Sequence, residues 1–180
     1  KSEVSNVLSR YSMTGNGKSV WLRAAGVVDY YNKCADFNIC GFKKELEAMV
    51  LPLTHTCSSS LQMRAEDITN QQFNDSCAVL STQESYFHQK LATNNTPVAD
   101  DYNTKLEMVV FNNSDSYKSH AGILFDIDTN NGGMYLEGDP SKVDNQARFI
   151  AYEAEWMLPE FHIWNLTHEY VHYLDGLFNL

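Results

Sequence analysis

The chain has 180 residues, 43% of them hydrophobic, which is enough for the core of one domain or of one domain with part of another. Its 23 acidic and 13 basic residues give a net charge of −10, which argues against a nucleic-acid partner because phosphates require a basic surface. No apolar run in the sequence is long enough to cross a membrane, so we expect no membrane partner.

The start of the chain is predicted to be helical. Apolar residues recur at helical spacing over residues 4–11, 20–31 and 42–51, and the pattern breaks at Thr14–Gly17 and at Pro52. Helix pairs of this size are typical of the end of a helical array. An ordinary helical subdomain is the alternative.

The chain has four cysteines, all in its first half: Cys34, Cys40, Cys57 and Cys77. Their spacing lacks the close CxxC pairs of a zinc knuckle, and their even number suggests two disulfides formed in an oxidising compartment. The simplest pairing joins Cys34 to Cys40 and Cys57 to Cys77. Sequence alone cannot fix the connectivity, and four free thiols are the alternative.

A serine-rich turn at Ser58–Ser60 marks a predicted domain boundary. A helical pattern then runs from Gln62 to Leu91, and residues 93–103 are predicted to form a loop.

The character of the sequence then changes from helix to strand. Residues 106–111, 134–137 and 148–153 are predicted strands. Between the first two, we expect a short helix starting within residues 112–120 and a turn-rich loop over residues 126–133. The strands predict a sheet in the second half of the chain.

Residues 168–172 read His-Glu-Tyr-Val-His, which is the HExxH pattern of zinc metallopeptidases. Positions i and i+4 of a helix share one face, so His168 and His172 can bind one metal ion while Glu169 lies beside them. Two imidazoles and a neighbouring base are the groups that zinc-dependent hydrolysis requires.

We expect this motif to lie on a strongly apolar helix. Pro159 suits the first turn of that helix, Glu155 and Glu160 place negative charge near the same end, and Gly176 is a natural stop. A buried helix with two hydrogen-bonded histidines is the alternative. However, an acid between two histidines on an apolar helix is costly without a metal or a partner.

Two segments carry a more specific pattern. Residues 128–137 read Asp-Thr-Asn-Asn-Gly-Gly-Met-Tyr-Leu-Glu, and residues 168–176 read His-Glu-Tyr-Val-His-Tyr-Leu-Asp-Gly. Together they resemble the bacterial collagenases, which are secreted gluzincin metallopeptidases, and most of all the vibrio-type branch of that family.

The resemblance implies an α+β fold, in which a helical-repeat segment precedes the upper, N-terminal zincin subdomain, a mixed twisted sheet over the HExxH helix. Residues 1–56 would be the C-terminal part of a helical-repeat activator domain. Residues 57–180 would be the N-terminal subdomain of a zinc peptidase domain, truncated after the active-site helix.

The resemblance also implies roles for the residues of the HExxH motif. His168 and His172 would bind zinc, and Glu169 would be the general base and then the proton donor to the leaving amine. Gluzincins take their third zinc ligand from a Glu on a later helix, but no Glu follows His172 in this chain. We therefore expect a piece of a longer enzyme that, by itself, binds zinc weakly and hydrolyses little.

Gly132 and Gly133 match the double-glycine motif of the family. Because neither residue has a Cβ, a substrate strand could approach the backbone closely, and Met134 and Tyr135 would pair with it. A simple turn before a strand is the alternative.

Glu137 matches a calcium ligand of the family, whose other ligands would be mostly backbone carbonyls near Gly176, Phe178 and Leu180. A carboxylate and carbonyl oxygens suit a hard cation. The alternative for Glu137 is the solvated end of a strand.

The resemblance predicts a secreted, extracellular and monomeric zinc metalloendopeptidase, with zinc and calcium as cofactors, that cleaves collagen, gelatin and collagen-like peptides. Collagen specificity rests on the resemblance alone, since the motif indicates only a zinc-dependent hydrolase. One alternative is a non-catalytic fragment that binds collagen or has a structural role. Another is a metallopeptidase for other extracellular proteins.

Overall fold

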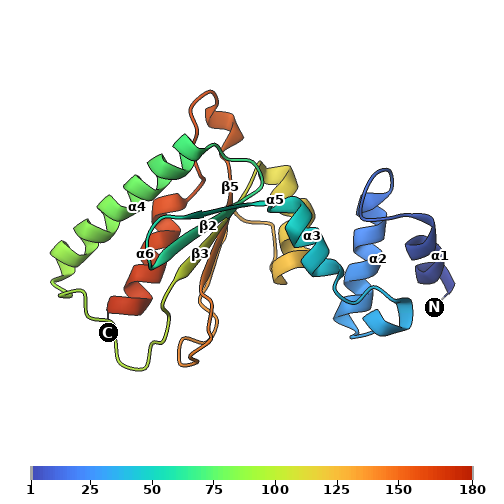
Figure 1. Ribbon diagram of the computed structural model, residues 1–180, viewed down its shortest axis with the longest axis horizontal. Helices are drawn as coiled ribbons and strands as arrows, with labels where there is room; N and C mark the ends of the chain where they lie inside the picture. The colour runs from blue at the N-terminus through green and yellow to red at the C-terminus, as the bar shows by residue number, and fades with distance from the viewer. Residues whose placement is uncertain (1, 180) are drawn as a thin grey trace.

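The computed structural model describes residues 2–179, which form six α-helices and one five-stranded sheet (Figure 1). The strand order is β1 (Leu53–Thr56), β2 (Leu61–Ala65), β3 (Leu106–Phe111), β5 (Arg148–Tyr152) and β4 (Met134–Leu136). The inner strands β2, β3 and β5 are parallel, and each edge strand is antiparallel to its neighbour. The predicted α+β class with a mixed sheet is confirmed. No helix within residues 2–179 is both long and apolar enough to span a membrane.

The helices cover both faces of the sheet. They are α1 (Ser2–Arg10), α2 (Lys18–Tyr30), α3 (Phe42–Val50), α4 (Asn70–Leu91), α5 (Ser114–Phe125) and α6 (Leu166–Phe178), with short 3₁₀ turns η1 (Cys34–Phe37) and η2 (Glu155–Met157). One hydrophobic cluster joins α4 and α6 to one face, and a second joins α2, α3 and α5 to the other (Figure 1).

The central strand β3 contributes to both clusters because neighbouring side chains of a strand point to opposite faces. Met108 and Val110 pack with α4 and α6, whereas Val109 and Phe111 pack with α2, α3 and α5. A strand that is covered on both faces is apolar without interruption. This double burial explains the apolar run from Met108 to Phe111 within the predicted strand.

The helix predicted from Gln62 to Leu91 is wrong at its beginning. Residues 61–65 form β2, in which Leu61, Met63 and Ala65 are buried and the residues between them are partly exposed. The helix α4 begins only after Thr69, whose side chain accepts a hydrogen bond from the Gln72 N–H in a capping box. The preceding strand β1, which pairs with β2, was not predicted at all.

Both predicted disulfides are confirmed. Cys34–Cys40 joins η1 to the segment before α3, and Cys57–Cys77 joins the β1–β2 hairpin to α4. The serine-rich turn at Ser58–Ser60 is the connection within that hairpin, so the sheet continues across the predicted boundary. Helices α2 and α3 also share a hydrophobic cluster with β3 and β5. The division of the chain at residue 56 stays a prediction.

The helix that carries the HExxH motif is shorter at its beginning than predicted. It starts at Leu166, and Pro159 lies in the preceding loop rather than in the first turn. Glu155 opens the separate turn η2. The helix also continues past Gly176 to Phe178, so this glycine does not end it.

Candidate functional site

The segment that leads into α6 is joined to the end of β5 by backbone hydrogen bonds. The Trp164 N–H donates to the Tyr152 carbonyl at 3.0 Å, and the Ala154 N–H donates to the His162 carbonyl at 2.8 Å. Asn165 then adopts a left-handed conformation, from which α6 begins. With these bonds, Ile163 forms a β-bridge with Glu153, and for this reason the helix does not begin at Pro159.

His168 and His172 lie one turn apart on the exposed face of α6, as the motif predicted. Their Nε2 atoms are 3.3 Å apart, and their ring centroids are 4.8 Å apart. Within residues 2–179, no three His, Cys, Asp or Glu side chains converge in an arrangement that could hold a metal ion. The structure therefore brings two of the expected zinc ligands together and supplies no third one within this range.

Glu169 lies on the inner side of α6 and is only 9% exposed. Its carboxylate has no hydrogen-bond partner among residues 2–179, which is unusual for a charged group with so little access to water. The carboxylate lies close enough to Tyr117 to affect its ionisation. Burial, followed by the negative charges of the ionised Tyr152, Asp128 and Glu169, raises the pKa of Tyr117 to about 12.

The position of α6 is fixed by polar contacts with α4. The Tyr170 hydroxyl donates to Glu84 Oε2 at 3.0 Å, and Gln83 Nε2 donates to the Thr167 carbonyl at 2.9 Å. Burial and then the Glu84 charge raise the pKa of Tyr170. Because Tyr170 lies within the motif, its hydrogen bond and the hydrophobic packing of α6 together orient the face that carries the two histidines.

The two glycines before β4 fit tightly against the rest of the protein. A Cβ at Gly132 would lie 2.5 Å from Trp164 Nε1 and 2.9 Å from Asn165 Nδ2. Gly133 has φ +129°, and its Cβ would lie 3.1 Å from the Ile150 carbonyl oxygen. The missing side chains thus permit close packing on the start of α6 and an unusual backbone conformation. Their predicted contact with a substrate strand stays a prediction.

Asn131 shapes the same turn. Its Oδ1 accepts hydrogen bonds from the Gly133 N–H and from the buried Tyr117 hydroxyl, and its Nδ2 donates to the Asp128 carbonyl. Sequence reasoning missed Asn131 and Tyr117. An Asn before two glycines is a recognisable turn former, whereas nothing near Tyr117 in the sequence indicates its partner.

The strand β4 is an edge strand beside the HExxH helix. It pairs with β5 on one side, and no other strand within residues 2–179 pairs with its outer edge. Met134 and Tyr135 are half-buried, and the Tyr135 ring lies against Tyr173 of α6 with centroids 6.3 Å apart. The unpaired backbone of β4 therefore runs next to the helix that carries the histidines.

The predicted calcium ligands are brought together only in part. Glu137 Oε1 lies 2.9 Å from the position that a Cβ on Gly176 would occupy, so the carboxylate touches α6 where only glycine fits. The Phe178 ring packs against His88 with centroids 4.5 Å apart. Leu180 lies outside the described residues.

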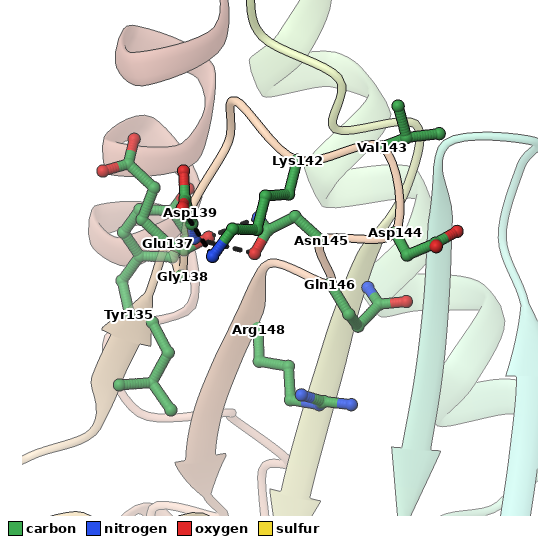
Figure 2. Close-up of a pocket in the computed structure, with 11 residues that line it drawn as sticks. Tyr135, Glu137, Gly138, Asp139, Lys142, Val143, Asp144, Asn145, Gln146 and Arg148 are labelled. Carbon is green, nitrogen blue, oxygen red and sulfur yellow. Dashed lines mark hydrogen bonds and ion pairs between the residues drawn. The ribbon is translucent and has the colours of Figure 1, made fainter.

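Glu137 also borders a hollow of about 1120 Å³ in the hairpin between β4 and β5 (Figure 2). The loop of this hairpin is held by its own side chains. Asn145 Nδ2 donates to the Glu137 carbonyl at 2.7 Å, and Lys142 pairs with Asp139 at 3.0 Å. The Glu137 carboxylate itself accepts no hydrogen bond within residues 2–179.

Comparison with known proteins identifies relatives over nearly the whole chain. The profile of the collagenase family (Peptidase_M9) matches residues 7–180. The chain is 47% identical over its full length to a microbial collagenase of Vibrio alginolyticus, of which it covers 22%. It is 41% identical over 96% of its length to a microbial collagenase of Vibrio parahaemolyticus, of which it covers 21%. It is 24% identical over 86% of its length to collagenase ColA of Bacillus cereus, of which it covers 15%.

Proposed function

Because the chain belongs to the Peptidase_M9 collagenase family, we propose that it contributes two zinc ligands and the general base of a metalloendopeptidase that hydrolyses collagen and gelatin. The chain spans 22% of the length of the Vibrio alginolyticus collagenase. In that relative, the activity therefore belongs to a longer polypeptide. The proposal assigns to this chain the upper zincin subdomain, in which the mixed sheet lies over the HExxH helix.

The separation of the two imidazole nitrogens carries this proposal. Two ligands on a tetrahedral zinc ion, each bound at its usual distance, are about 3.3–3.4 Å apart. The Nε2 atoms of His168 and His172 are 3.3 Å apart, and both rings are exposed on one face of α6. This donor set fits zinc. It leaves room for a third protein ligand and for substrate on the exposed side of the helix.

Glu169 suits the role of general base and proton donor. A carboxylate that is 9% exposed and has no partner within residues 2–179 is available to accept a proton on one of its oxygens. When bound, zinc would polarise the scissile carbonyl and lower the pKa of the attacking water. Glu169 would take the proton from that water and pass it to the nitrogen of the leaving amine, which restores the carboxylate.

The free edge of β4 suits an extended peptide. A substrate strand that adds to Met134 and Tyr135 would form backbone hydrogen bonds next to the histidine face of α6. Gly132 and Gly133 would set the position of this edge, because they fix the turn that precedes it against α6. Backbone recognition of this kind tolerates varied side chains, so sequence preference would come from other contacts.

A calcium ion fits the contact between Glu137 and Gly176. The carboxylate without a partner would bind it together with carbonyl oxygens near Gly176, Phe178 and Leu180. Such a cation would tie the end of β4 to the end of α6, and so stabilise the substrate edge relative to the zinc ligands.

Two disulfides support a secreted, extracellular location, because such bonds form and persist in oxidising compartments. We further propose that residues 1–56 end a helical activator domain, that residues 57–180 begin the peptidase domain, and that the enzyme acts as a monomer on collagen-type substrates.

The test is peptide hydrolysis by the full-length protein, with Glu169→Gln compared with the wild type on a collagen-type peptide that contains Gly-Pro. We expect a loss of at least about 10³-fold in kcat/KM with unchanged zinc content, because the variant keeps both histidines but cannot accept the proton. Glu160→Gln is the matched control, because Glu160 is an exposed acid in the loop before the same helix.

Equal rates for the wild type and Glu169→Gln would overturn the assignment of Glu169. If the wild type binds collagen but hydrolyses neither the peptide nor gelatin, the non-catalytic alternative is correct. If it hydrolyses casein but not collagen-type peptides, the chain belongs to a metallopeptidase with another extracellular substrate.

A further inference from the structure

A second hollow lies on the opposite face of the sheet from the HExxH helix. It has a volume of about 820 Å³ and is lined by the beginning of α2, the loop that precedes it, and α5. These helices belong to the hydrophobic cluster that covers the far side of the sheet (Figure 1). The hollow is therefore remote from the candidate metal centre.

The charges that line this hollow are all positive. Lys18, Arg23 and Lys118 border it, and no Asp or Glu does. None of the three cations pairs with a carboxylate within residues 2–179. By contrast, Lys43 pairs with both Asp29 and Asp126 on the same side of the sheet. Three unpaired cations without an acid are conspicuous in a chain with a net charge of −10.

A buried histidine also faces the hollow. His120 is 8% exposed and lines the hollow beside Lys118. Its Nδ1 lies 2.9 Å from the Ser116 carbonyl oxygen, whereas its Nε2 has no partner within residues 2–179. Burial, followed by the positive charge of Lys18, lowers the pKa of His120.

The beginning of α2 adds further donors. The helix starts after Gly17, which has φ 84°, no side chain caps its first turn, and that turn contains no acidic residue. A Cβ at Gly17 would collide with the Tyr11 ring, so packing permits no side chain at this position. The first N–H groups of a helix carry a partial positive charge and bind anions. The Ser19 and Ser119 side chains line the same hollow.

We propose that the hollow between α2 and α5 binds a tetrahedral oxyanion, either a sulfate or a phosphate group. Its negative charge would be shared among Lys18, Arg23 and Lys118, and its oxygens would accept hydrogen bonds from the first turn of α2. The volume exceeds that of a free ion, so a sulfate ester on a sugar can enter with part of the sugar. This site is independent of the proposed metallopeptidase function.

The test is isothermal titration of the full-length protein with four probes: sodium sulfate, sodium phosphate, a sulfated disaccharide and the same disaccharide without sulfate. Lys118→Glu and Arg23→Glu are the test variants, because both residues are exposed and folding should survive. Lys44→Glu is the matched control, since Lys44 is exposed on α3, changes the net charge equally and does not line the hollow. Circular dichroism checks the fold of each variant.

We expect the wild type and Lys44→Glu to bind at least one anionic probe with affinities within about twofold of each other. Each test variant should bind at least tenfold more weakly. Preference for the sulfated disaccharide would identify a sulfated polysaccharide as the source of the anion, and equal binding of the inorganic ions would identify a small anion. Either result supports the site. The proposal is wrong if the wild type binds none of the charged probes, or if all three variants weaken binding equally.

Discussion

The two polar regions of the molecule are built in different ways. On one face of the sheet, His168, Glu169 and His172 come from a single turn of α6. On the other face, Lys18 and Lys118 converge from two helices that lie far apart in the sequence. Helical geometry alone brings the first group together, so its chemistry can be read from residue spacing. The second group exists only because the fold brings α2 next to α5.

The two regions also differ in how firmly their helices are held. On the face that carries the HExxH motif, a part-buried hydrogen bond from Tyr170 to Glu84 and an exposed one from Gln83 to Thr167 join α6 and α4. On the anion side, the first turn of α2 has no side-chain cap and the cations have no partners within residues 2–179. We therefore expect substitutions on the metal side to change catalysis and stability, and substitutions around the anion hollow to change binding alone.

The largest expected effect comes from removing one of the two proposed zinc ligands. His168→Ala leaves one imidazole from the motif, so we expect the purified full-length protein to lose stoichiometric zinc and at least about 10³-fold in kcat/KM on a collagen-type peptide. Metal analysis by mass spectrometry and a peptide assay would measure both. Titration with the anionic probes should give the same affinity as the wild type, because the hollow lies on the other face.

His162→Ala is the matched control for that experiment. His162 is exposed in the loop before α6 and interacts with Glu160 at 3.5 Å, away from the histidine pair. Zinc content and rate should both stay within about twofold of the wild type. Equal loss in the two variants would show that the motif is not the metal site.

The next largest effect is the loss of stability on removal of a disulfide, and it should differ between the two disulfides. Cys57–Cys77 closes a loop with a sequence separation of 20 on the metal side, and Cys34–Cys40 closes one of 6 on the anion side. In the chain-entropy model these loops contribute about 3 and about 2 kcal/mol to the free energy of unfolding. Double Cys→Ala variants compared by chemical denaturation would measure the difference. A larger loss from Cys34–Cys40 would contradict the ranking.

Sequence reasoning succeeded where the signal is local. The HExxH helix has the required i, i+4 spacing, and the strand at 106–111 is apolar apart from Glu107, because both of its faces are covered. The disulfides join the first cysteine to the second and the third to the fourth, which is the simplest pairing in sequence order. Each of these features depends on residues that are close together along the chain.

Sequence reasoning failed where the local structure depends on residues that are far away in the sequence. Residues 61–65 have an alternating pattern, but a short strand needs β3 to pair with, and the helical pattern that follows obscured it. The predicted start at Pro159 failed because residues 162–164 form backbone hydrogen bonds with Tyr152 at the end of β5 and with Ala154. Gly176 was predicted to end α6, but it lies inside the helix. A glycine is needed there because Glu137, from another segment, occupies the space that a side chain would fill. Tyr117 and the anion hollow were missed for the same reason.

Replacing one glycine on each face of the sheet by alanine should change the stability by less than loss of the Cys57–Cys77 disulfide. The two replacements should have opposite signs. Gly133→Ala should destabilise the protein by about 2 kcal/mol, because its φ of +129° is unfavourable for any side chain and its Cβ would crowd the Ile150 carbonyl. Gly26→Ala, within α2, should stabilise it by about 0.5–1 kcal/mol, since no atom lies within 4 Å of the new Cβ. Chemical denaturation measures both. Destabilisation by Gly26→Ala would mean that α2 packs differently.

The smallest effect compares a buried hydrogen bond with a surface ion pair. Tyr170→Phe removes the donor to Glu84 from a residue that is 1% exposed, and we expect a loss of about 1 kcal/mol in the free energy of unfolding. Lys43→Met removes pairs with Asp29 and Asp126, whose side chains are 37% and 80% exposed, so we expect less than about 0.5 kcal/mol.

Zinc affinity distinguishes these two variants better than stability alone. Because the Tyr170 hydrogen bond fixes the rotation of α6, its loss should also lower zinc affinity, by about twofold to tenfold, whereas Lys43→Met should leave zinc affinity unchanged. Competition with a zinc chelator measures this difference in the full-length protein. If Tyr170→Phe lowers stability but not zinc affinity, hydrophobic packing against β3 and β5 orients the histidines without help from α4.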